Sequence, residues 1–237
     1  MNRLFRTLLI STLLFNDSFV AAAQQPVEIR GAMRNVMRKG QLGSTIHLDT
    51  ISNKSHLFGL GPVEYLRGEL LILDGKSYIS RVSGDSMVVE ESFQVSAPFF
   101  VYSNVDSWKT ITLPDSILNM KQLEQHLDGL TQHINSPFAF RLQGKVAQAK
   151  IHVVNLPEGS KVSSPEEAHR GQQNYHLSNE EVEIIGFFSK EHQSVFTHHD
   201  TWMHMHLITN DRTQMGHLDE VTFAPGSVRL FLPARMR

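Results

Sequence analysis

Three histidines near the C-terminal end have the residue type and spacing of ligands for a single metal ion. His204 and His206 are two positions apart in the largely apolar stretch 202–209. Alternate side chains of a β-strand share a face, so both imidazoles should point the same way while their neighbours point into the core. The polar stretch 210–216 predicts a turn, after which a returning strand would bring His217 beside the pair. Three histidines that leave a coordination position open to water or substrate are typical of a catalytic zinc site.

Two further histidines, His198 and His199, precede this segment. Either of them can replace or join one of the three ligands, or form part of the pocket wall around the metal. The chain holds 13 histidines, and histidine is the commonest protein ligand for borderline transition metals. A strand with alternating histidines also occurs on pH-sensitive or ordinary surfaces, so metal binding is the favoured interpretation and not the only one.

A carboxylate and an arginine within apolar segments are the other candidates for chemistry. Glu69 begins an apolar run, where a carboxylate that faces the core needs a cation or a metal as its partner. Arg141 lies within the mostly apolar segment 137–142, where its guanidinium group can pair with the carboxylate of a substrate. Both positions are also compatible with structural ion pairs.

The composition favours a globular protein that acts on a small molecule. Of the 237 residues, 41% are hydrophobic and 19% are charged, which is enough for a substantial core. The formal net charge is −2 and the charges form no long runs, so we expect neither a nucleic-acid partner nor attraction to an anionic membrane. The expected ligand is a small neutral or anionic molecule. The chain has no cysteine, so disulfides contribute nothing to its stability.

Residues 1–23 resemble a secretory signal peptide. Two arginines give a positive start, residues 8–15 are apolar, and three alanines at 21–23 offer the small residues that precede a cleavage site. The apolar run is too short to span a bilayer, and no later segment resembles a transmembrane helix. We therefore expect an exported protein, periplasmic or secreted, whose mature part is residues 24–237. An uncleaved amphipathic N-terminus is the alternative.

Hairpins and helices are expected to surround these candidates. Apolar or β-branched runs at 70–73, 78–82 and 87–89 are separated by Asp74-Gly75 and Gly84-Asp85, turn sequences that predict consecutive hairpins.

Three helices are expected from spacing and capping residues. Residues 26–39 place apolar side chains on one helical face and end at Gly40. Residues 117–134 repeat leucine and isoleucine at helical spacing. The sequence Ser164-Pro165-Glu166-Glu167 carries a capping serine, a proline for the first turn and a glutamate that can complete a capping box.

Further strands are expected at 145–154, 181–188, 202–209 and 227–232. This order predicts an α+β fold with two β-rich parts and a few helices. The expected parts are a mixed sheet and a C-terminal, β-barrel-like sheet that carries the metal site. A sub-boundary near residue 135 fits the order, although no linker is visible there.

Four segments, in this order along the chain, resemble the α-acetolactate decarboxylase family. Residues 59–78 are similar to its pattern G-x-G-T-F-x-x-L-x-G-E-L followed by D-G and Y, and residues 138–144 resemble F-Y-A-x-R-x-x-G. Residues 184–188 resemble V-G-F-x-x-P, and residues 204–217 resemble H-x-H-F-x-x-x-D-R-x-x-G-G-H, which is the most specific match. The resemblance therefore covers most of the mature chain.

The resemblance implies a lyase that decarboxylates 2-acetolactate to acetoin, a step of acetoin and butanediol formation, and that is usually a homodimer. The implied ligands of Zn²⁺ are His204, His206 and His217. Glu69 would lie near the metal and is the leading candidate for the proton donor, and Arg141 would bind the substrate carboxylate. The expected partner is thus a small hydroxy keto acid, with neither nucleic acid nor membrane as a partner of the mature chain.

The chain departs from the family pattern at three places. Pro62 replaces a threonine, Met215 replaces a glycine, and no acidic residue follows Leu232-Pro233, where the family has a second catalytic glutamate. Either Glu220 or another carboxylate takes its place, or the proton-transfer step has changed.

Three other interpretations are open. The first is a metal-binding relative that has lost decarboxylation and binds or converts another small oxyacid. The second is a cupin-like non-haem iron oxygenase, against which stands the absence of a carboxylate about four positions after His206. The third is an exported structural or adhesive protein, which predicts no ordered arrangement of three histidines.

Overall fold

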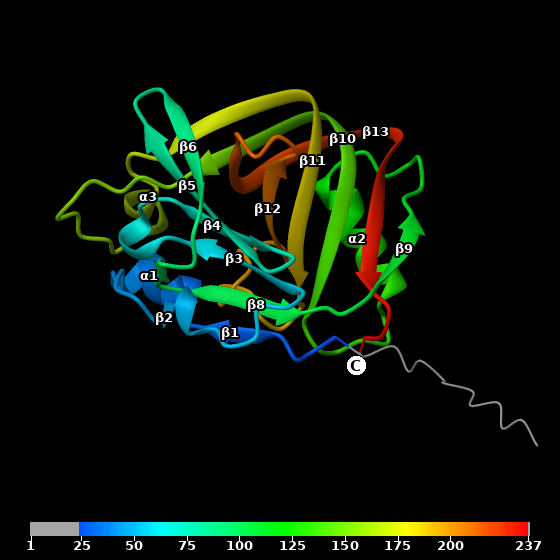
Figure 1. Ribbon diagram of the computed structural model, residues 1–237, viewed down its shortest axis with the longest axis horizontal. Helices are drawn as coiled ribbons and strands as arrows, with labels where there is room; N and C mark the ends of the chain where they lie inside the picture. Colours follow the sequence, from blue (N-terminus) through cyan, green and yellow to red (C-terminus); the bar gives the residue numbers. More distant parts are fainter. Residues whose placement is uncertain (1–23, 237) are drawn as a thin grey trace, which may run out of the picture.

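Two antiparallel β-sheets that share a core make up most of the chain (Figure 1). A computed structural model describes residues 24–236, so the predicted signal peptide lies outside the described residues. The first sheet contains, in spatial order, β1 (Glu28–Arg30), β8 (Phe100–Asn104), β3 (Leu57–Pro62), β4 (Glu69–Leu73), β5 (Lys76–Ser83) and β6 (Ser86–Glu91). The second contains β10 (Phe138–Val153), β11 (Gln173–Phe188), β12 (Met203–Thr209), β13 (Met215–Pro233) and β9 (Trp108–Thr112). The remaining elements are a ribbon of β2 (Ile46–His47) and β7 (Ser96–Ala97) and the helices α1 (Met33–Lys39), α2 (Met120–Leu130) and α3 (Pro165–Ala168).

The α+β class is confirmed, but the first sheet is antiparallel where a mixed sheet was expected. Short hairpins join β4 to β5 and β5 to β6, and parallel pairing would need long crossover connections instead. Asp74 and Gly75, with φ of 47° and 79°, form the turn between β4 and β5 with the left-handed backbone that hairpin turns favour. The predicted hairpins are therefore confirmed.

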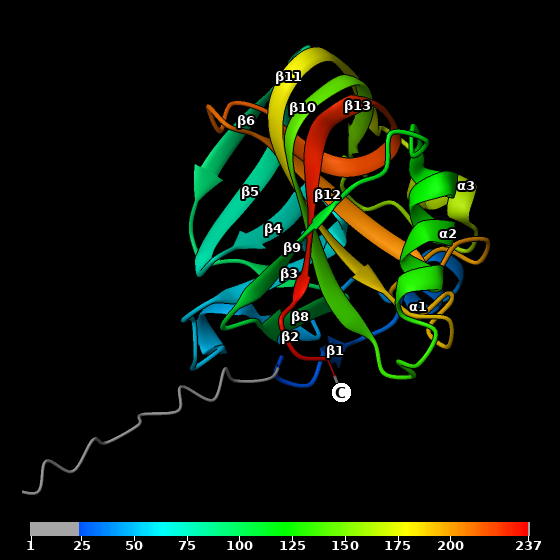
Figure 2. The same cartoon turned by 90° about the vertical axis from the view of Figure 1, so that its right-hand side faces the viewer.

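The second sheet closes partly on itself without forming a complete barrel. β10 pairs with β11 on one side and with β13 on the other, and β13 also pairs with β12 and β9 (Figure 2). The β12–β13 pairing extends only from His206↔His217 to Ile208↔Met215, and β13 pairs with β10 from His217 onward. The first residues of β12 therefore have no hydrogen-bonded neighbour on the β13 side of the described sheet, which leaves an opening beside the predicted metal ligands.

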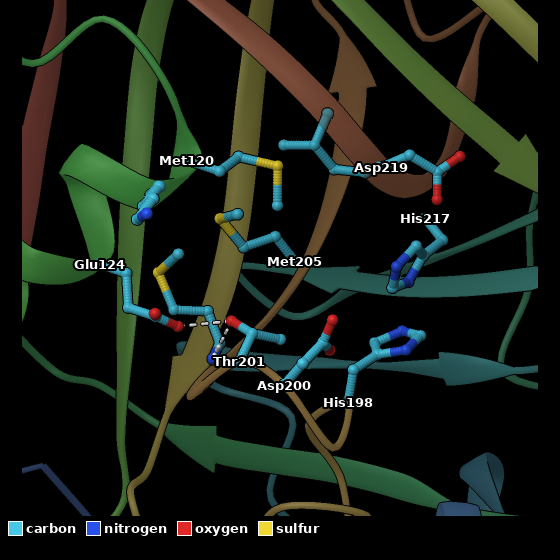
Figure 3. A pocket seen from close by; sticks show the side chains of 11 residues that line it. Met120, Glu124, His198, Asp200, Thr201, Met205, His217 and Asp219 are labelled. Atoms are coloured by element: carbon cyan, nitrogen blue, oxygen red, sulfur yellow. Dashed lines mark hydrogen bonds between the residues drawn. The ribbon is translucent and has the colours of Figure 1, made fainter.

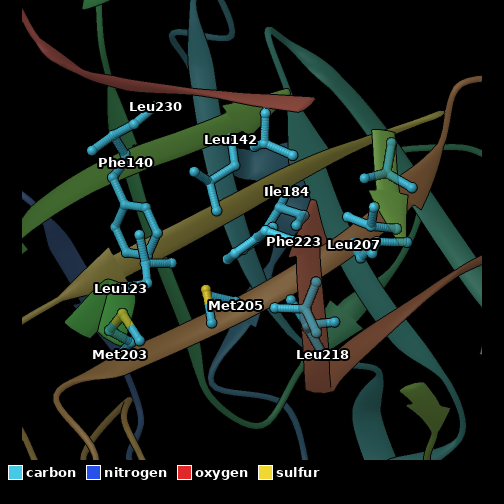
Figure 4. Packing of buried hydrophobic residues seen from close by; sticks show 14 of the residues in the cluster. Leu123, Phe140, Leu142, Ile184, Met203, Met205, Leu207, Leu218, Phe223 and Leu230 are labelled. Atoms are coloured by element: carbon cyan, nitrogen blue, oxygen red, sulfur yellow. The ribbon is translucent and has the colours of Figure 1, made fainter. Parts of the chain in front are cut away.

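Two hydrophobic clusters fix the faces of this sheet. The concave face encloses a cluster that α2 covers with Leu123 and Leu127, and Met203, Met205 and Leu207 of β12 point into it (Figure 4). The opposite face packs against the first sheet through residues of both sheets: Phe58, Leu71, Ile185, Phe187, Ile208 and Met215. Residues of β12 therefore alternate between the two clusters, so His204 and His206 face the first sheet.

The first two helices lie within the segments predicted for them but are shorter than expected. The segment 26–39 is helical only from Met33, because Glu28–Arg30 pairs with β8; it ends at Gly40, whose φ is 63°. Helix α2 begins after Asn119, whose side chain accepts a hydrogen bond from the Gln122 N–H.

The third predicted helix is confirmed as α3. Ser164 caps it by accepting a hydrogen bond from the Glu167 N–H, and Pro165 occupies its first turn. Within residues 24–236, no helix is long and apolar enough to cross a membrane.

Replacing Gly186 by alanine is expected to destabilise the fold by about 1–3 kcal/mol, because the core has no room for another methyl group. An added Cβ would lie 2.2 Å from Cζ of Phe140, its buried cross-strand partner. Gly129→Ala is the matched control: it lies in α2 with nothing within 4 Å of the added Cβ, so it should stabilise by roughly 0.5–1 kcal/mol. Urea unfolding of both variants checks this, and equal effects would contradict it.

Candidate metal centre

The three predicted metal ligands meet where β12 and β13 begin to separate. His204 and His206 lie opposite Phe187 and Ile185 of β11, and His217 of β13 lies directly opposite His206. Ligand atoms of the three imidazoles lie within 4.8 Å of one another. His204 Nε2 and His217 Nδ1 are 3.1 Å apart, and the three side chains are 0–8% exposed. The strand alternation and the turn at 210–216 thus produce the predicted cluster.

The electrostatics of this cluster suit a metal ion. Burial lowers the pKa of His206 to about 3, with the nearby His152 as a smaller cause. Burial likewise holds the pKa values of His204 and His217 well below their usual range. All three imidazoles are therefore neutral at pH 7, the form that binds metals.

Unpaired ring nitrogens also point to a metal. Among the described residues, His204 Nδ1 and both ring nitrogens of His206 are buried without a hydrogen bond of normal geometry, and buried polar atoms seldom lack a partner. A cavity of about 20 Å³ touches His204 and His217, which is room for one small species such as a water molecule or an ion. The residues present fit a metal ion.

Glu69 lies at the same centre, at the start of β4. Its Oε2 is 3.7 Å from His206 Nε2, and its Oε1 accepts a hydrogen bond of 3.3 Å from the Val154 N–H. The side chain is 4% exposed. Burial raises the pKa of this carboxyl group well above its usual range, and the charge of Asp219 adds to the effect. In the metal-free protein burial therefore favours the protonated, neutral form of Glu69.

These shifts predict that the metal-free protein loses stability as the pH falls below about 6.5, the pKa of an unfolded histidine. The unfolded chain takes up protons there that His204, His206 and His217 exclude until much lower pH. His206 alone should contribute about 1.4 kcal/mol per pH unit between about pH 6.5 and pH 3. The contribution of Glu69 to this pH dependence has the opposite sign, because its raised pKa makes the free energy of unfolding fall as the pH rises above about 4.5. The three histidines together outweigh this single group.

Urea unfolding in the presence of a chelator at pH 7.5 and 5.5 measures this dependence. A free energy of unfolding that is equal at the two values, or larger at pH 5.5, would contradict the prediction.

The structure adds two residues that the sequence prediction missed. His152 of β10 lies directly opposite His217, with ring centroids 4.7 Å apart. Its Nδ1 is 2.8 Å from Asp219 Oδ1, and its Nε2 is 3.9 Å from Glu69 Oε1. The signal available in the sequence was a lone histidine within the apolar run 151–154 and an aspartate two positions after His217.

A larger cavity opens next to the histidines. It measures about 460 Å³, and His198, His217 and Asp219 line one side while Met120 and Glu124 of α2 line the other (Figure 3). This volume suits a small molecule.

The loop before β12 completes this cavity. Glu124 accepts hydrogen bonds from the Thr201 hydroxyl and the Trp202 N–H, which fixes the loop to α2 (Figure 3). The His198 ring lies 5.2 Å from the His217 ring, whereas the His199 side chain is exposed. Of the two neighbouring histidines, His198 therefore belongs to the pocket wall.

Arg141 is not brought into this cavity. It shares a face of the second sheet with His206, but Ile185 of β11 lies between them in the register. Its Nη2 donates to Glu183 Oε2 at 2.7 Å, and Arg212 Nη2 donates to the other oxygen of the same carboxylate at 2.6 Å. The three side chains line a separate cavity of about 680 Å³.

The residues at which the chain departs from the family pattern lie in different parts of the structure. Pro62 lies beside Glu69 at the 20 Å³ cavity, where the family pattern has a threonine. Met215 is fully buried between the sheets. Glu220, the candidate substitute for the missing glutamate, is exposed and lies 3.7 Å from Lys150. Asp219, not Glu220, is the carboxylate of β13 that reaches the histidines.

Comparison with known proteins identifies a family for the chain. Residues 31–235 match the family model of alpha-acetolactate decarboxylase. The chain is 26% identical over 173 residues to the alpha-acetolactate decarboxylase of Methanosarcina mazei, covering 73% of this chain and 58% of that protein. It is 25% identical over 179 residues to that of Lactococcus lactis subsp. cremoris, covering 73% and 70%. The chain thus spans less than two thirds of the length of the Methanosarcina relative.

Solved structures show the same fold. The crystal structure of alpha-acetolactate decarboxylase from Bacillus subtilis superposes with a TM-score of 0.71 at 21% identity, over 90% of this chain and 88% of that one. A Staphylococcus aureus protein of unknown function, described as similar to alpha-acetolactate decarboxylase, gives a TM-score of 0.71 at 16% identity, over 87% and 85%. With a family match over most of its length and this shared fold, the chain belongs to the alpha-acetolactate decarboxylase family.

Proposed function

We propose that this protein is a zinc-dependent decarboxylase that converts 2-acetolactate to acetoin and carbon dioxide. The observation that carries the proposal is the meeting of three buried imidazoles and a buried glutamate beside a cavity of the size of a small molecule. Family membership supplies the substrate class.

The metal ligands in this proposal are His204, His206 and His217. Zinc is the favoured ion because it accepts three imidazoles and leaves a position open. When bound, zinc would polarise the substrate oxygens and stabilise the negative charge that develops as carbon dioxide leaves. The burial of the three ligands would strengthen these interactions by lowering the local dielectric constant.

Glu69 supplies the proton in this proposal. Loss of carbon dioxide breaks a carbon–carbon bond and leaves the electron pair on the remaining fragment, which needs one proton to become acetoin. Since Glu69 Oε1 accepts from the Val154 N–H, the acidic proton belongs on Oε2, the oxygen that faces His206. The carboxylate then recovers a proton from water, so the cycle is balanced.

Arg141 is proposed to bind the substrate carboxylate, a role that rests on the family resemblance alone, because its guanidinium pairs with Glu183 and lines a different cavity from the one beside the histidines. We expect Arg141→Gln to lower kcat/KM by roughly 100-fold or more, mostly through KM, since a charge-assisted bidentate pair would be lost. Arg212→Gln removes the other partner of the same Glu183 carboxylate and is the matched control. Equal losses in the two variants would show that Arg141 acts only through Glu183.

Acetoin release from racemic 2-acetolactate tests the function. Spontaneous decarboxylation of the racemate gives racemic acetoin, whereas protonation in a chiral site should give an excess of one enantiomer. Zinc-loaded wild-type protein should show this excess and His206→Ala should not. A folded, zinc-loaded protein that releases acetoin no faster than the spontaneous reaction, and without an enantiomeric excess, would reject the decarboxylase and leave a metal-binding relative with another small oxyacid as its ligand.

Export and dimerisation are further parts of the proposal. The composition of residues 1–23 supports export, and N-terminal sequencing of the protein recovered outside the cytoplasm should begin at Gln24. The homodimer is an expectation from the family, which sedimentation analysis of the purified chain would test.

A further inference from the structure

A second group of potential metal ligands lies next to the first. His152 of β10 and His217 and Asp219 of β13 offer ligand atoms within 4.8 Å of one another. The two histidines are cross-strand partners, and Asp219 lies at the register shift two residues after His217, where its Oδ1 is 2.8 Å from His152 Nδ1. Two imidazoles and one carboxylate form a set that zinc and other first-row divalent ions accept.

A hydrogen bond between His152 and Asp219 does not account for the whole arrangement. It uses Asp219 Oδ1, at 2.8 Å from His152 Nδ1. Asp219 Oδ2 is also buried and has no hydrogen-bond partner among the described residues. An unpaired buried carboxylate oxygen is costly, and a divalent cation would satisfy it.

The position of this group relative to solvent suggests what it does. His217 and Asp219 line the open cavity of about 460 Å³, whereas His204 and His206 do not. His204 touches only the smaller cavity of about 20 Å³, which His152 and His217 also line. An ion that enters through the larger cavity therefore meets Asp219 and His217 before it reaches the deeper pair, His204 and His206.

We propose that His152, His217 and Asp219 form a second divalent-metal position, which shares His217 with the three-histidine position and receives the ion before it moves inward. The shared imidazole lets the ion exchange one ligand set for the other without being released. The inference rests on the three-histidine position of the proposed function, but not on decarboxylation. Metal content and uptake are its readouts, so its failure is distinguishable from the failure of the proposed reaction.

Removal of the deeper pair should reveal the second position. The double variant His204→Ala/His206→Ala, dialysed against zinc, is expected to retain about one zinc ion per chain by elemental analysis. Adding Asp219→Asn should remove that ion, whereas adding Glu220→Gln, a neighbouring exposed glutamate, should not. A folded double variant without zinc, or one whose zinc content is unaffected by Asp219→Asn, would overturn the proposal.

A kinetic measurement tests the same position with the deeper pair intact. Stopped-flow absorbance of Co²⁺ uptake by the metal-free full chain should be slower by on the order of tenfold or more in Asp219→Asn and in His152→Gln. Glu220→Gln should take up Co²⁺ as fast as the wild type. Uptake at the wild-type rate in both Asp219→Asn and His152→Gln would contradict an entry position.

Discussion

Replacing His217 by alanine is expected to remove the bound metal and to lower the rate of acetoin formation by on the order of 10³-fold or more, about 4 kcal/mol of transition-state stabilisation. His217 belongs to both groups of potential ligands, so its loss leaves neither set complete. The truncation also opens a cavity against His152 and His204, whose rings lie 4.7 and 4.9 Å from the His217 ring.

Elemental analysis and an acetoin assay of the same preparation measure both effects. His199→Ala is the matched control, because this histidine is exposed and, within residues 24–236, its hydrogen bond is made by the main-chain carbonyl, which accepts from Gln193. It should keep the metal and the activity of the wild type. A His217→Ala protein that retains full zinc content and activity would contradict the metal centre described above.

Replacing Glu69 by glutamine is expected to lower kcat by roughly 10²–10⁴-fold, the usual contribution of a positioned general acid, while zinc content stays close to that of the wild type. Glutamine has the shape of the protonated glutamic acid and can still accept the Val154 hydrogen bond through its side-chain oxygen. Since burial raises the pKa of Glu69 and so favours its neutral form in the metal-free protein, the substitution should remove an acidic proton at little cost in stability.

Steady-state kinetics of Glu69→Gln and Glu220→Gln show which of these two glutamates, both named as candidates from the sequence, donates the proton. Glu220 is 75% exposed at its side chain and lies near Lys150 in a different cavity from the histidines, so its replacement should leave kcat unchanged. Loss of activity in Glu220→Gln with retention in Glu69→Gln would reverse the assignment of the proton donor.

The cluster of three histidines could be predicted because local sequence patterns determine it. His204 and His206 alternate with buried methionines in a single strand, and the polar turn returns the chain to His217, so a stretch of 14 residues contains the whole geometry. His152 was not predictable in the same way. It meets His217 only because β13 leaves β12 and pairs with β10, a contact between residues 65 positions apart, and the sequence carries no local signal for that register.

The missed strands have a similar explanation. β3 has the sequence Leu57-Phe58-Gly59-Leu60-Gly61-Pro62, whose glycines and proline argue against a strand when taken alone. In the fold the Phe100 ring of the neighbouring β8 occupies the space beside Gly59, where an added Cβ would lie 2.7 Å away. Packing with a distant strand therefore decides the conformation of this segment, and the same strand places Pro62 opposite Glu69.

Acetoin formation before and after metal removal is the decisive test of a metal-dependent decarboxylase. The purified chain is treated with a chelator, freed of the chelator, and assayed with 2-acetolactate while zinc is added back. We expect no acetoin above the spontaneous rate without metal, and a rate that rises with added zinc until the site is filled. An undiminished rate in the metal-free protein, or none in a folded and zinc-saturated one, would contradict it.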